Sequence, residues 1–418
     1  MKALALVLVP FVLVACGSPP KEPASQGNKG DSASPPSAGT GTEASPKASA
    51  QAGGAGGSSP AGAPSKPAGV TLAQISTADP ECALDSEGKP WRWNAGHLEA
   101  GPTTVSGAKS ISCSSSHTCV IASDATVQCW GDNTYGALGD GKQTSESPDA
   151  VVVAKDVKGA AEVVVDVSRT CARTQDGNVY CWGDREFAKA GDGTLIDGHK
   201  GREKPLPGKP VLGLTGAVSL GISSLHACSS TGDGSVMCWG QCRSGACGQP
   251  PKPPWLPRAM KAAKVSGIAT LSAGETASCG VDKSGAVMCW GTSSNGVLGE
   301  SVTDTKPHEA ASKIALPSAA TEVAVGNDNH ACARLANGAV YCWGQNDHGQ
   351  LGDGSKEDKK APVQVKGVEG ATHVSAGDGT SCAIASGKMW CWGQKRLMKK
   401  GAKDLEDTST PVEISVLK

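Results

Sequence analysis

The sequence predicts an all-β repeat protein of the β-propeller type, and two observations support this prediction. The motif Cys-Trp-Gly recurs at intervals of 49 to 57 residues, and a fixed period of this length indicates an array of one supersecondary unit. The motif tryptophans are Trp130, Trp182, Trp239, Trp290, Trp343 and Trp392. The segments between them hold short Val/Ala runs separated by Gly, Pro, Asp and Ser, which is typical of strands joined by turns.

The N-terminus reads as an export signal. An apolar run from Ala3 to Val14 is too short to span a bilayer. It ends in Leu13-Val14-Ala15-Cys16, which resembles the bacterial lipobox, where the cysteine is lipidated and becomes the first mature residue. We therefore expect residues 1–15 to be a lipoprotein signal peptide and Cys16 to carry a lipid; an ordinary signal peptide is the alternative. Gly17 follows the lipobox cysteine, and a residue other than Asp at this position resembles the signal for sorting to the outer membrane. We therefore expect an exported protein that is anchored to the cell envelope, most of all to the outer membrane.

Residues 16–69 read as a tether. From Gly17 to Gly69 the chain contains no apolar residue larger than Ala, so it cannot bury a core. These 53 residues correspond to an end-to-end distance of roughly 40 Å. The folded part is expected in residues 70–418. The net charge of −1 argues against nucleic acid, which requires a basic face. We expect a monomer with no cofactor and no metal.

The cysteine spacing predicts a disulfide-stapled hairpin in each repeat. A spacing of ten centres the hairpin on one residue, and in four of five copies that residue precedes Gly, as in a three-residue loop with a G1 bulge. Ala125 replaces the glycine in the other copy, where we expect a strained or altered turn. A spacing of nine requires an even loop, which Ser386-Gly387 provides. In both cases the cysteines fall on a non-hydrogen-bonded pair, where side chains approach closely. The pairs are Cys119–Cys129, Cys171–Cys181, Cys228–Cys238, Cys279–Cys289, Cys332–Cys342 and Cys382–Cys391.

The remaining cysteines also pair. A degenerate seventh copy runs from Cys82 to Trp93, and Arg92 stands there in place of the second cysteine. Cys113 is the nearest unpaired cysteine, so we expect Cys82–Cys113. Cys242 and Cys247 share one loop and are expected to pair. With Cys16 lipidated, all 17 cysteines are accounted for.

Zinc and free redox thiols are the alternatives to disulfides. His117, His226 and His330 each stand two residues before a cysteine, but the other repeats lack this histidine. Structural zinc sites also prefer two to four residues between ligands. Export makes persistent thiols improbable. Disulfides are therefore the preferred interpretation.

The segment from His330 to Gly354 resembles the consensus of the regulator of chromosome condensation repeats, and His117 to Gly141 is similar to it. The likeness covers residues 70–418. It implies a seven-bladed β-propeller of four-stranded antiparallel blades. Pro411 to Leu417 resembles the closing strand that completes the first blade. The eukaryotic namesake exchanges guanine nucleotide on a GTPase, but its exchange residues do not map onto this chain, so exchange activity is the least favoured function.

Motifs for catalysis or cofactor binding are weak. Gly136 to Lys142 matches a phosphate-loop pattern, but Gln143 stands where Ser or Thr is required. The pairs Asp140-Gly141, Asp192-Gly193 and Asp353-Gly354 lack the alternating acids of a calcium loop. An envelope hydrolase or lyase with a site at the propeller mouth is therefore the alternative to a binding protein.

Two long loops follow Trp-Gly motifs, at residues 195–210 and 241–258. The second carries Cys242, Cys247, five prolines and an extra tryptophan. A rigid loop that presents Trp and Arg is typical of recognition sites, so Arg243, Trp255 and Arg258 are the candidate binding residues. A blade-edge insertion with Trp255 packed on its neighbour is the alternative. The leading functional hypothesis is a lipid-anchored, non-enzymatic propeller that binds a protein or glycan at the cell envelope.

Overall fold

The computed structural model describes residues 70–76, 81–94, 97–186, 189–194, 210–250, 252–302, 304–394 and 407–416. The chain divides into two compact units, residues 1–65 and 66–418, and every described residue belongs to the second. Cys16, the tether and most of the loop at 195–210 therefore lie outside the described residues. No helix in the described ranges is long and apolar enough to cross a membrane.

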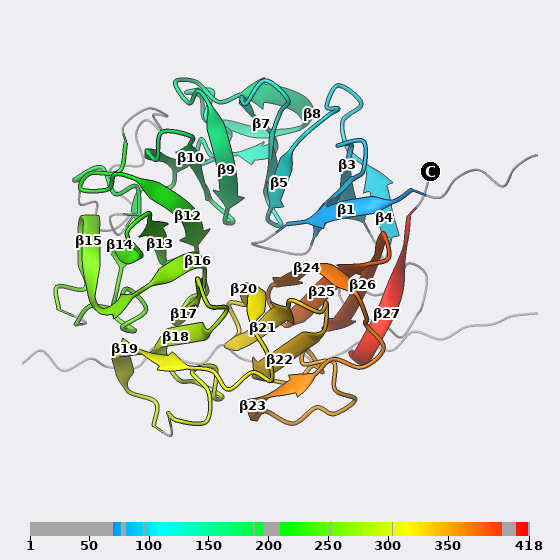
Figure 1. Cartoon of the computed structure of the whole chain (residues 1–418). Helices are drawn as coiled ribbons and strands as arrows, with labels where there is room; N and C mark the ends of the chain where they lie inside the picture. Colours follow the sequence, from blue (N-terminus) through cyan, green and yellow to red (C-terminus); the bar gives the residue numbers. More distant parts are fainter. Residues whose placement is uncertain are drawn as a thin grey trace, which may run out of the picture. The chain divides into compact units, whose positions relative to one another are not determined.

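The described strands form seven successive antiparallel blades around a central axis (Figure 1). They make six sheets, because the outer strands of the first and seventh blades pair and join these two blades in one eight-stranded sheet. In each blade the chain starts on the inside and moves outward, strand by strand. The first blade comprises β1 (Leu72–Ile75), β2 (Cys82–Asp85), β3 (Pro90–Asn94) and β4 (His97–Ala100). The second comprises β5 (Ser110–Cys113), β6 (His117–Ile121), β7 (Val127–Asn133) and β8 (Thr144–Val153). The third comprises β9 (Ala160–Val165), β10 (Arg169–Thr174) and β11 (Val179–Gly183). In the third blade an isolated bridge between Tyr180 and Pro210 lies where the fourth strand lies elsewhere.

The other four blades each have four strands. The fourth blade comprises β12 (Ala217–Ile222), β13 (His226–Thr231), β14 (Ser235–Gln241) and β15 (Trp255–Ser266), and the fifth β16 (Ile268–Ala273), β17 (Ala277–Asp282), β18 (Val287–Thr292) and β19 (Pro307–Lys313). The sixth comprises β20 (Ala320–Val325), β21 (His330–Leu335), β22 (Val340–Gly344) and β23 (Lys359–Gln364). The seventh comprises β24 (Ala371–Ala376), β25 (Thr380–Ala385), β26 (Lys388–Gly393) and β27 (Thr408–Val416). The all-β propeller predicted from the sequence is confirmed.

The hairpin between the two central strands has the predicted geometry. In the third blade the Gly177 N–H donates to the Thr174 carbonyl at 2.9 Å, and Gly177 has φ +78°. This closes a three-residue loop of the G1-bulge type. In the seventh blade Ser386 and Gly387 both have positive φ, as a two-residue type I′ turn requires. The spacings of ten and nine therefore select two different turns.

The same turns join each blade to the next. The Ala217 N–H that begins the fourth blade donates to the Gly177 carbonyl at 3.0 Å, and a Cβ at Gly177 would lie 2.8 Å from the Cα of Gly216. Ala125 makes the equivalent bond from Ala160 at 3.0 Å, but it does so at φ +63°, which is the strained turn expected there. In the last of these bonds the Leu72 N–H donates to the Gly387 carbonyl at 2.8 Å, and this bond closes the ring.

The expectation that Pro411 to Leu417 completes the first blade is wrong. Residues 408–416 form β27, the outer strand of the seventh blade, which pairs with β26 over Met389 to Gly393. The first blade already has its own four strands, β1 to β4. β27 contacts it only through two parallel residue pairs with β4. Each outer strand thus follows its own Trp-Gly motif, and the last one is no exception.

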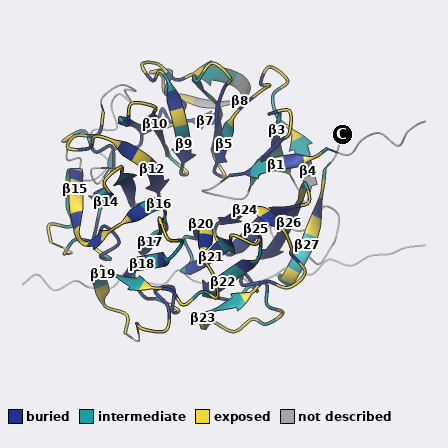
Figure 2. Cartoon of the chain, in the orientation of Figure 1, coloured by how far each residue is buried: buried dark blue, intermediate teal, exposed yellow. Residues whose placement is uncertain are grey.

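The apolar core lies between the blades (Figure 2). One cluster combines Cys119, Ile121 and Val127 of the second blade with Val163 and Trp182 of the third. The motif tryptophans of the third to seventh blades are among the largest fully buried side chains of the described residues. Because each blade buries its faces against two neighbours, the stability of one blade depends on the presence of the next.

Candidate functional site

The structure brings the sixteen cysteines from Cys82 to Cys391 into the eight expected pairs. Six pairs link the two central strands of one blade with Cα atoms 4.1 Å apart, the close approach of a non-hydrogen-bonded pair. Cys242–Cys247 closes the loop after Trp239. Cys82–Cys113 runs from β2 to β5 and is the only disulfide between two blades in the described part of the chain.

The tryptophan of the motif fastens each of five blades to the preceding one. The Trp343 indole N–H donates to the Val297 carbonyl at 2.8 Å. That carbonyl belongs to the turn that follows the preceding Trp-Gly motif. The other four bonds are Trp182 to Ala137, Trp239 to Lys189, Trp290 to Ala246 and Trp392 to Gln350. The motif is therefore a joint between blades.

Three buried histidines reinforce the same joints. His226 Nε2 lies 2.9 Å from Oγ of Ser278 in the next blade, and that hydroxyl donates to the Ala246 carbonyl at 3.0 Å. Ala246 thus receives both this hydroxyl and the indole of Trp290. The pattern recurs in two further sets: His117, Thr170 and Ala137; His330, Ser381 and Gln350. These contacts explain the histidines through blade packing.

Two of these rings are held neutral. Burial, reinforced by the positive charge of Arg92, lowers the pKa of His117 to about 3. Burial, reinforced by Arg169, lowers the pKa of His226 to about 3. No group of three or more His, Cys, Asp or Glu side chains in the described ranges is arranged to hold a metal ion. The zinc interpretation therefore gains no support from the histidines.

Asp328, His330 and Ser381 form a serine–histidine–aspartate arrangement. His330 Nε2 lies 2.8 Å from Ser381 Oγ, and its Nδ1 contacts the Asp328 carboxylate. In a hydrolase such a series activates the serine as a nucleophile. Here the Ser381 hydroxyl is fully buried and donates to the Gln350 carbonyl at 2.9 Å. Because the other two histidines make the same joint without a bonded aspartate, the arrangement follows from blade packing, and no catalytic role follows from it.

The Cys242–Cys247 disulfide replaces an asparagine contact found in two other blades. Asn133 and Asn346 are each the third residue after a motif tryptophan. Their side-chain oxygens accept a hydrogen bond from the backbone N–H five residues further on, that of Leu138 at 3.0 Å and that of Leu351 at 2.9 Å. Cys242 is also third after its motif tryptophan, and Cys247 is five residues on. The disulfide therefore holds the turn that carries the acceptor Ala246. Sequence reasoning missed this role, which an alignment of the repeats on tryptophan would have indicated.

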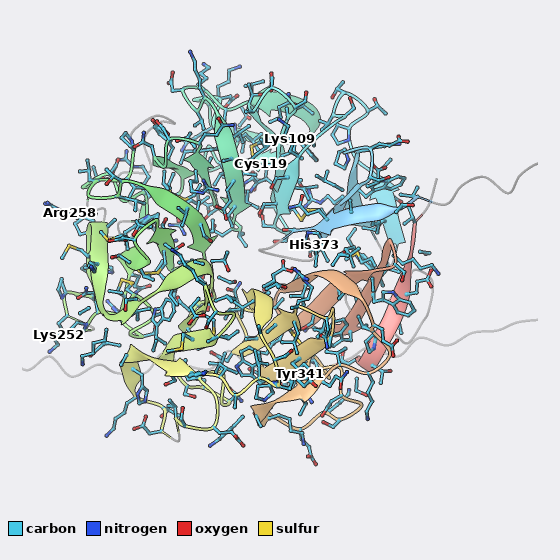
Figure 3. The ribbon with its side chains drawn as sticks, in the orientation of Figure 1. Lys109, Cys119, Lys252, Arg258, Tyr341 and His373 are labelled. Carbon is cyan, nitrogen blue, oxygen red and sulfur yellow. A yellow bond between two sulfur atoms is a disulfide. The ribbon has the colours of Figure 1, made fainter. Side chains whose placement is uncertain are left out.

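The candidate binding residues lie on the fourth blade. The guanidinium carbon of Arg243 lies 5.6 Å from the ring centroid of Trp255, and the two side chains are exposed and half-buried, respectively. Arg258 is exposed three residues further along β15 and lies on the outer rim together with Lys252 (Figure 3). The structure thus brings Arg243 and Trp255 together, and no recorded bond joins Arg258 to them within the described residues.

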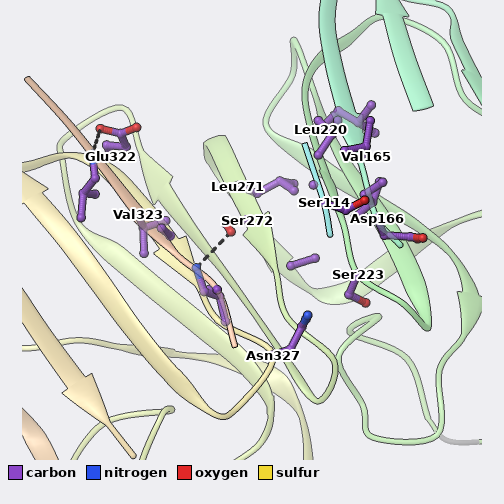
Figure 4. A pocket seen from close by; sticks show the side chains of 18 of the residues that line it. Ser114, Val165, Asp166, Leu220, Ser223, Leu271, Ser272, Glu322, Val323 and Asn327 are labelled. Carbon is purple, nitrogen blue, oxygen red and sulfur yellow. Dashed lines mark hydrogen bonds between the residues drawn. The ribbon is translucent and has the colours of Figure 1, made fainter. Parts of the chain in front are cut away.

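A central cavity of about 380 Å³ is lined by the inner strands and by the turns that follow them (Figure 4). Leu220, Leu271 and Val323 form part of its apolar wall. Asp166 and Asp378 lie in the turns after β9 and β24, towards one end of the cavity. The other end is lined by Glu162, Glu322 and His373, which are each the third residue of an inner strand, and by Arg334, which pairs with Glu322 across β20 and β21. The cavity therefore has one acidic end and one end of mixed charge.

Residues 102–418 match the model of the RCC1-like domain family. The chain belongs to this family. The resemblance noted in the repeats is thereby confirmed. Human E3 ubiquitin-protein ligase HERC2 is 28% identical over 277 residues, which cover 64% of this chain and 6% of HERC2. Human HERC4, a probable E3 ubiquitin-protein ligase, is 25% identical over 227 residues, covering 53% of this chain and 21% of HERC4. This chain thus spans a small part of these relatives.

Solved structures of RCC1-like propellers are similar to this chain. Yeast RCC1 (Prp20), from its complex with Kap60, superposes with a TM-score of 0.62 at 19% identity, covering 73% of this chain and 74% of that one. Human WBSCR16 superposes with a TM-score of 0.64 at 18% identity, covering 76% and 87%. At these identities the likeness shows the fold alone. The function of this RCC1-like chain must therefore be argued from its own residues.

Proposed function

We propose that this RCC1-like chain is a lipid-anchored, non-enzymatic propeller that binds a partner at the cell envelope. The anchor is inferred from the export signal and the lipobox cysteine Cys16. The binding role is inferred from the stacked pair of Arg243 and Trp255 on the fourth blade. This pair is the observation that carries the proposal.

The use of polar groups inside the propeller favours binding over catalysis. The hydroxyls and imidazoles that would serve as nucleophile or base, such as Ser278, Ser381 and His226, are buried and bonded across blade joints. A nucleophile must reach its substrate, and these groups lack solvent contact. Arg243 and Arg258 on the rim of the fourth blade are exposed instead.

The Arg243–Trp255 pair has the features of a protein-binding hot spot. Arg and Trp are the residue types most enriched at such positions. The Cys242–Cys247 disulfide fixes the turn that bears Arg243, which reduces the ordering cost on binding. Because the guanidinium covers one face of the indole, that face is not free to stack on a sugar ring. The geometry therefore favours a protein partner with carboxylates over a glycan.

The binding role is tested with the full-length protein in its native envelope. Cross-linking followed by purification should recover a partner with the wild type and at least ten-fold less of it with Arg243→Ala/Trp255→Ala. Asp347→Ala is the matched control, because Asp347 is the fourth residue after its motif tryptophan, as Arg243 is. Equal recovery from all three proteins, with unchanged thermal unfolding, would exclude this rim as the interface.

The anchor is tested separately. Intact-mass analysis of the wild type should find a lipid on Cys16 and sixteen blocked thiols. Cys16→Ser should move the protein from the membrane fraction to the soluble fraction while the propeller remains folded. A Cys16→Ser variant that stays with the membrane would contradict lipidation as the anchor, and sixteen reactive thiols would contradict the disulfides.

A further inference from the structure

Two glutamate–arginine pairs beside the central channel are built alike. In the sixth blade the Arg334 Nε–H donates to Glu322 Oε2 at 3.1 Å, and in the third blade the Arg173 Nε–H donates to Glu162 Oε2 at 2.8 Å. Each glutamate also accepts a backbone N–H from the inner strand of the next blade, at 3.2 Å in both cases. Each carboxylate is therefore fixed from two sides and orients its arginine.

The surroundings of the two arginines differ. Arg334 lines the central cavity, whereas Arg173 is not part of the lining. His373, the third residue of β24, lies next to Arg334, and Figure 3 places it beside the central opening. The third residue of β12, at the corresponding joint beside Arg173, is Ser219. Among the described residues that line the cavity, an arginine and a histidine thus occur together only at the joint between the sixth and seventh blades.

Arg334 has hydrogen-bonding capacity to spare. Its Nε is bonded to Glu322, and within the described residues its terminal nitrogens make no hydrogen bond. The side chain is 21% exposed and lines the cavity. The two terminal nitrogens of a guanidinium match two oxygens of a carboxylate or phosphate. Because Glu322 holds the guanidinium in place, little side-chain entropy would be lost on binding.

The rest of the cavity defines which ligand fits. At the acidic end, Asp378 disfavours an anion and the Asp166 carboxylate is already ion-paired with Arg169, so an anionic group would be directed to Arg334. The apolar wall of Leu220, Leu271 and Val323 would contact the body of such a molecule (Figure 4). A volume of about 380 Å³ lies in the range of small-molecule pockets.

We propose that the central channel binds a small molecule with an apolar body through its carboxylate or phosphate group, with Arg334 as the main contact and His373 as a second donor. Burial, reinforced by Arg334, lowers the pKa of His373, so the free ring is neutral and donates one N–H. Both neighbouring glutamates are already bonded to arginines. The two polar contacts, Arg334 and His373, lie in the sixth and seventh blades, so the site does not depend on the rim of the fourth.

The experiment uses the purified full-length chain with hexanoate, hexyl phosphate and neutral hexanol as probes in titration calorimetry. Hexanoate or hexyl phosphate should bind the wild type, and comparison of the two identifies the preferred acid. Arg334→Gln should weaken binding at least ten-fold. Arg173→Gln, which breaks an equivalent pair outside the cavity, should change it less than two-fold. His373→Gln should weaken binding several-fold without changing stability.

The ring of His373 gives a readout that does not depend on stability. With labelled histidine, the His373 resonances should shift on addition of the binding acid in the wild type and in Arg173→Gln, and Arg334→Gln should need at least ten-fold more acid for the same shift. Equal losses in both glutamine variants, or equal binding of hexanol and hexanoate, would overturn the proposal. So would saturable binding that leaves the His373 resonances unmoved.

Discussion

The first blade and the later blades are fastened to their neighbours by different chemistry. From the third blade onward, a motif tryptophan donates to a carbonyl of the preceding blade. The first blade has no Gly-x-Leu-Gly turn after Trp93, and within the described residues Trp130 of the second blade makes no indole hydrogen bond. The first and second blades are joined instead by the Cys82–Cys113 disulfide and by Arg92, whose guanidinium donates to the carbonyls of Ser114 and Ser115. A repeat can therefore lose its motif if another bond holds the interface.

The largest effect should come from removing the bond that is unique to the first blade. Cys82→Ser/Cys113→Ser opens a link across 31 residues, and Cys171→Ser/Cys181→Ser opens one across 10. In the chain-entropy model these cost about 4 and about 3 kcal/mol. Hydrogen exchange should show local opening of residues 70–100 only in the first variant. Equal exchange in both variants would mean that the first blade does not depend on its disulfide.

The tryptophan joints provide the second test. Trp343→Phe removes the indole donor to Val297 and leaves a buried carbonyl without it, at a cost of about 2 kcal/mol. Trp130→Phe removes an N–H that has no such acceptor, so it should cost less than half as much. Denaturant unfolding of the two variants measures the difference, and a larger loss in Trp130→Phe would refute the assigned joint.

Acid should weaken the joints that contain histidine. His117 and His226 have a pKa of about 3 when folded and an ordinary value of 6.5 when unfolded, so the unfolded state binds protons first as the pH falls. Their contribution is complete above pH 6.5 and decreases as the pH falls from 6.5 towards 3. Each of these two histidines should lower the free energy of unfolding by about 1.4 kcal/mol when the pH falls from 7.5 to 5.5.

A glutamine variant isolates this contribution. His226→Gln removes one titrating group, so its stability should fall by about 1.4 kcal/mol less than that of the wild type over the same pH interval. Chemical unfolding at both pH values provides the measurement. The same pH slope in the variant and the wild type would show that His226 does not titrate on unfolding.

The smallest effect is expected at the one non-glycine turn of the blade joints. Ala125 adopts φ +63°, and Ala125→Gly should stabilise the protein by up to about 1 kcal/mol, since relief of strain exceeds the added entropy of the unfolded chain. The reverse change, Gly177→Ala, adds the same strain and a 2.8 Å contact with Gly216, so it should destabilise. Thermal unfolding compares the two, and destabilisation by Ala125→Gly would show that the turn is unstrained.

Contacts within a blade could be predicted from the sequence, whereas contacts between blades could not. The cysteine pairs follow from hairpin parity, because the residues lie nine or ten apart and the turn residues fix the count. His226 and Ser278 lie 52 residues apart, and only the closed ring brings them together. Glu322 looked like one of many scattered carboxylates, because its link to Arg334 and the next blade depends on the register of β20 and β21.

The position of Cys82 also bears on how the propeller would withstand mechanical load. The chain enters the ring through β1, which has only four residues and pairs with β2. A pull from the N-terminal side would first act on the hydrogen bonds of β1. Once these separate, the next strand carries Cys82, whose covalent bond to Cys113 passes the force to the second blade. Unravelling from this end would therefore stop after one strand unless that bond is broken.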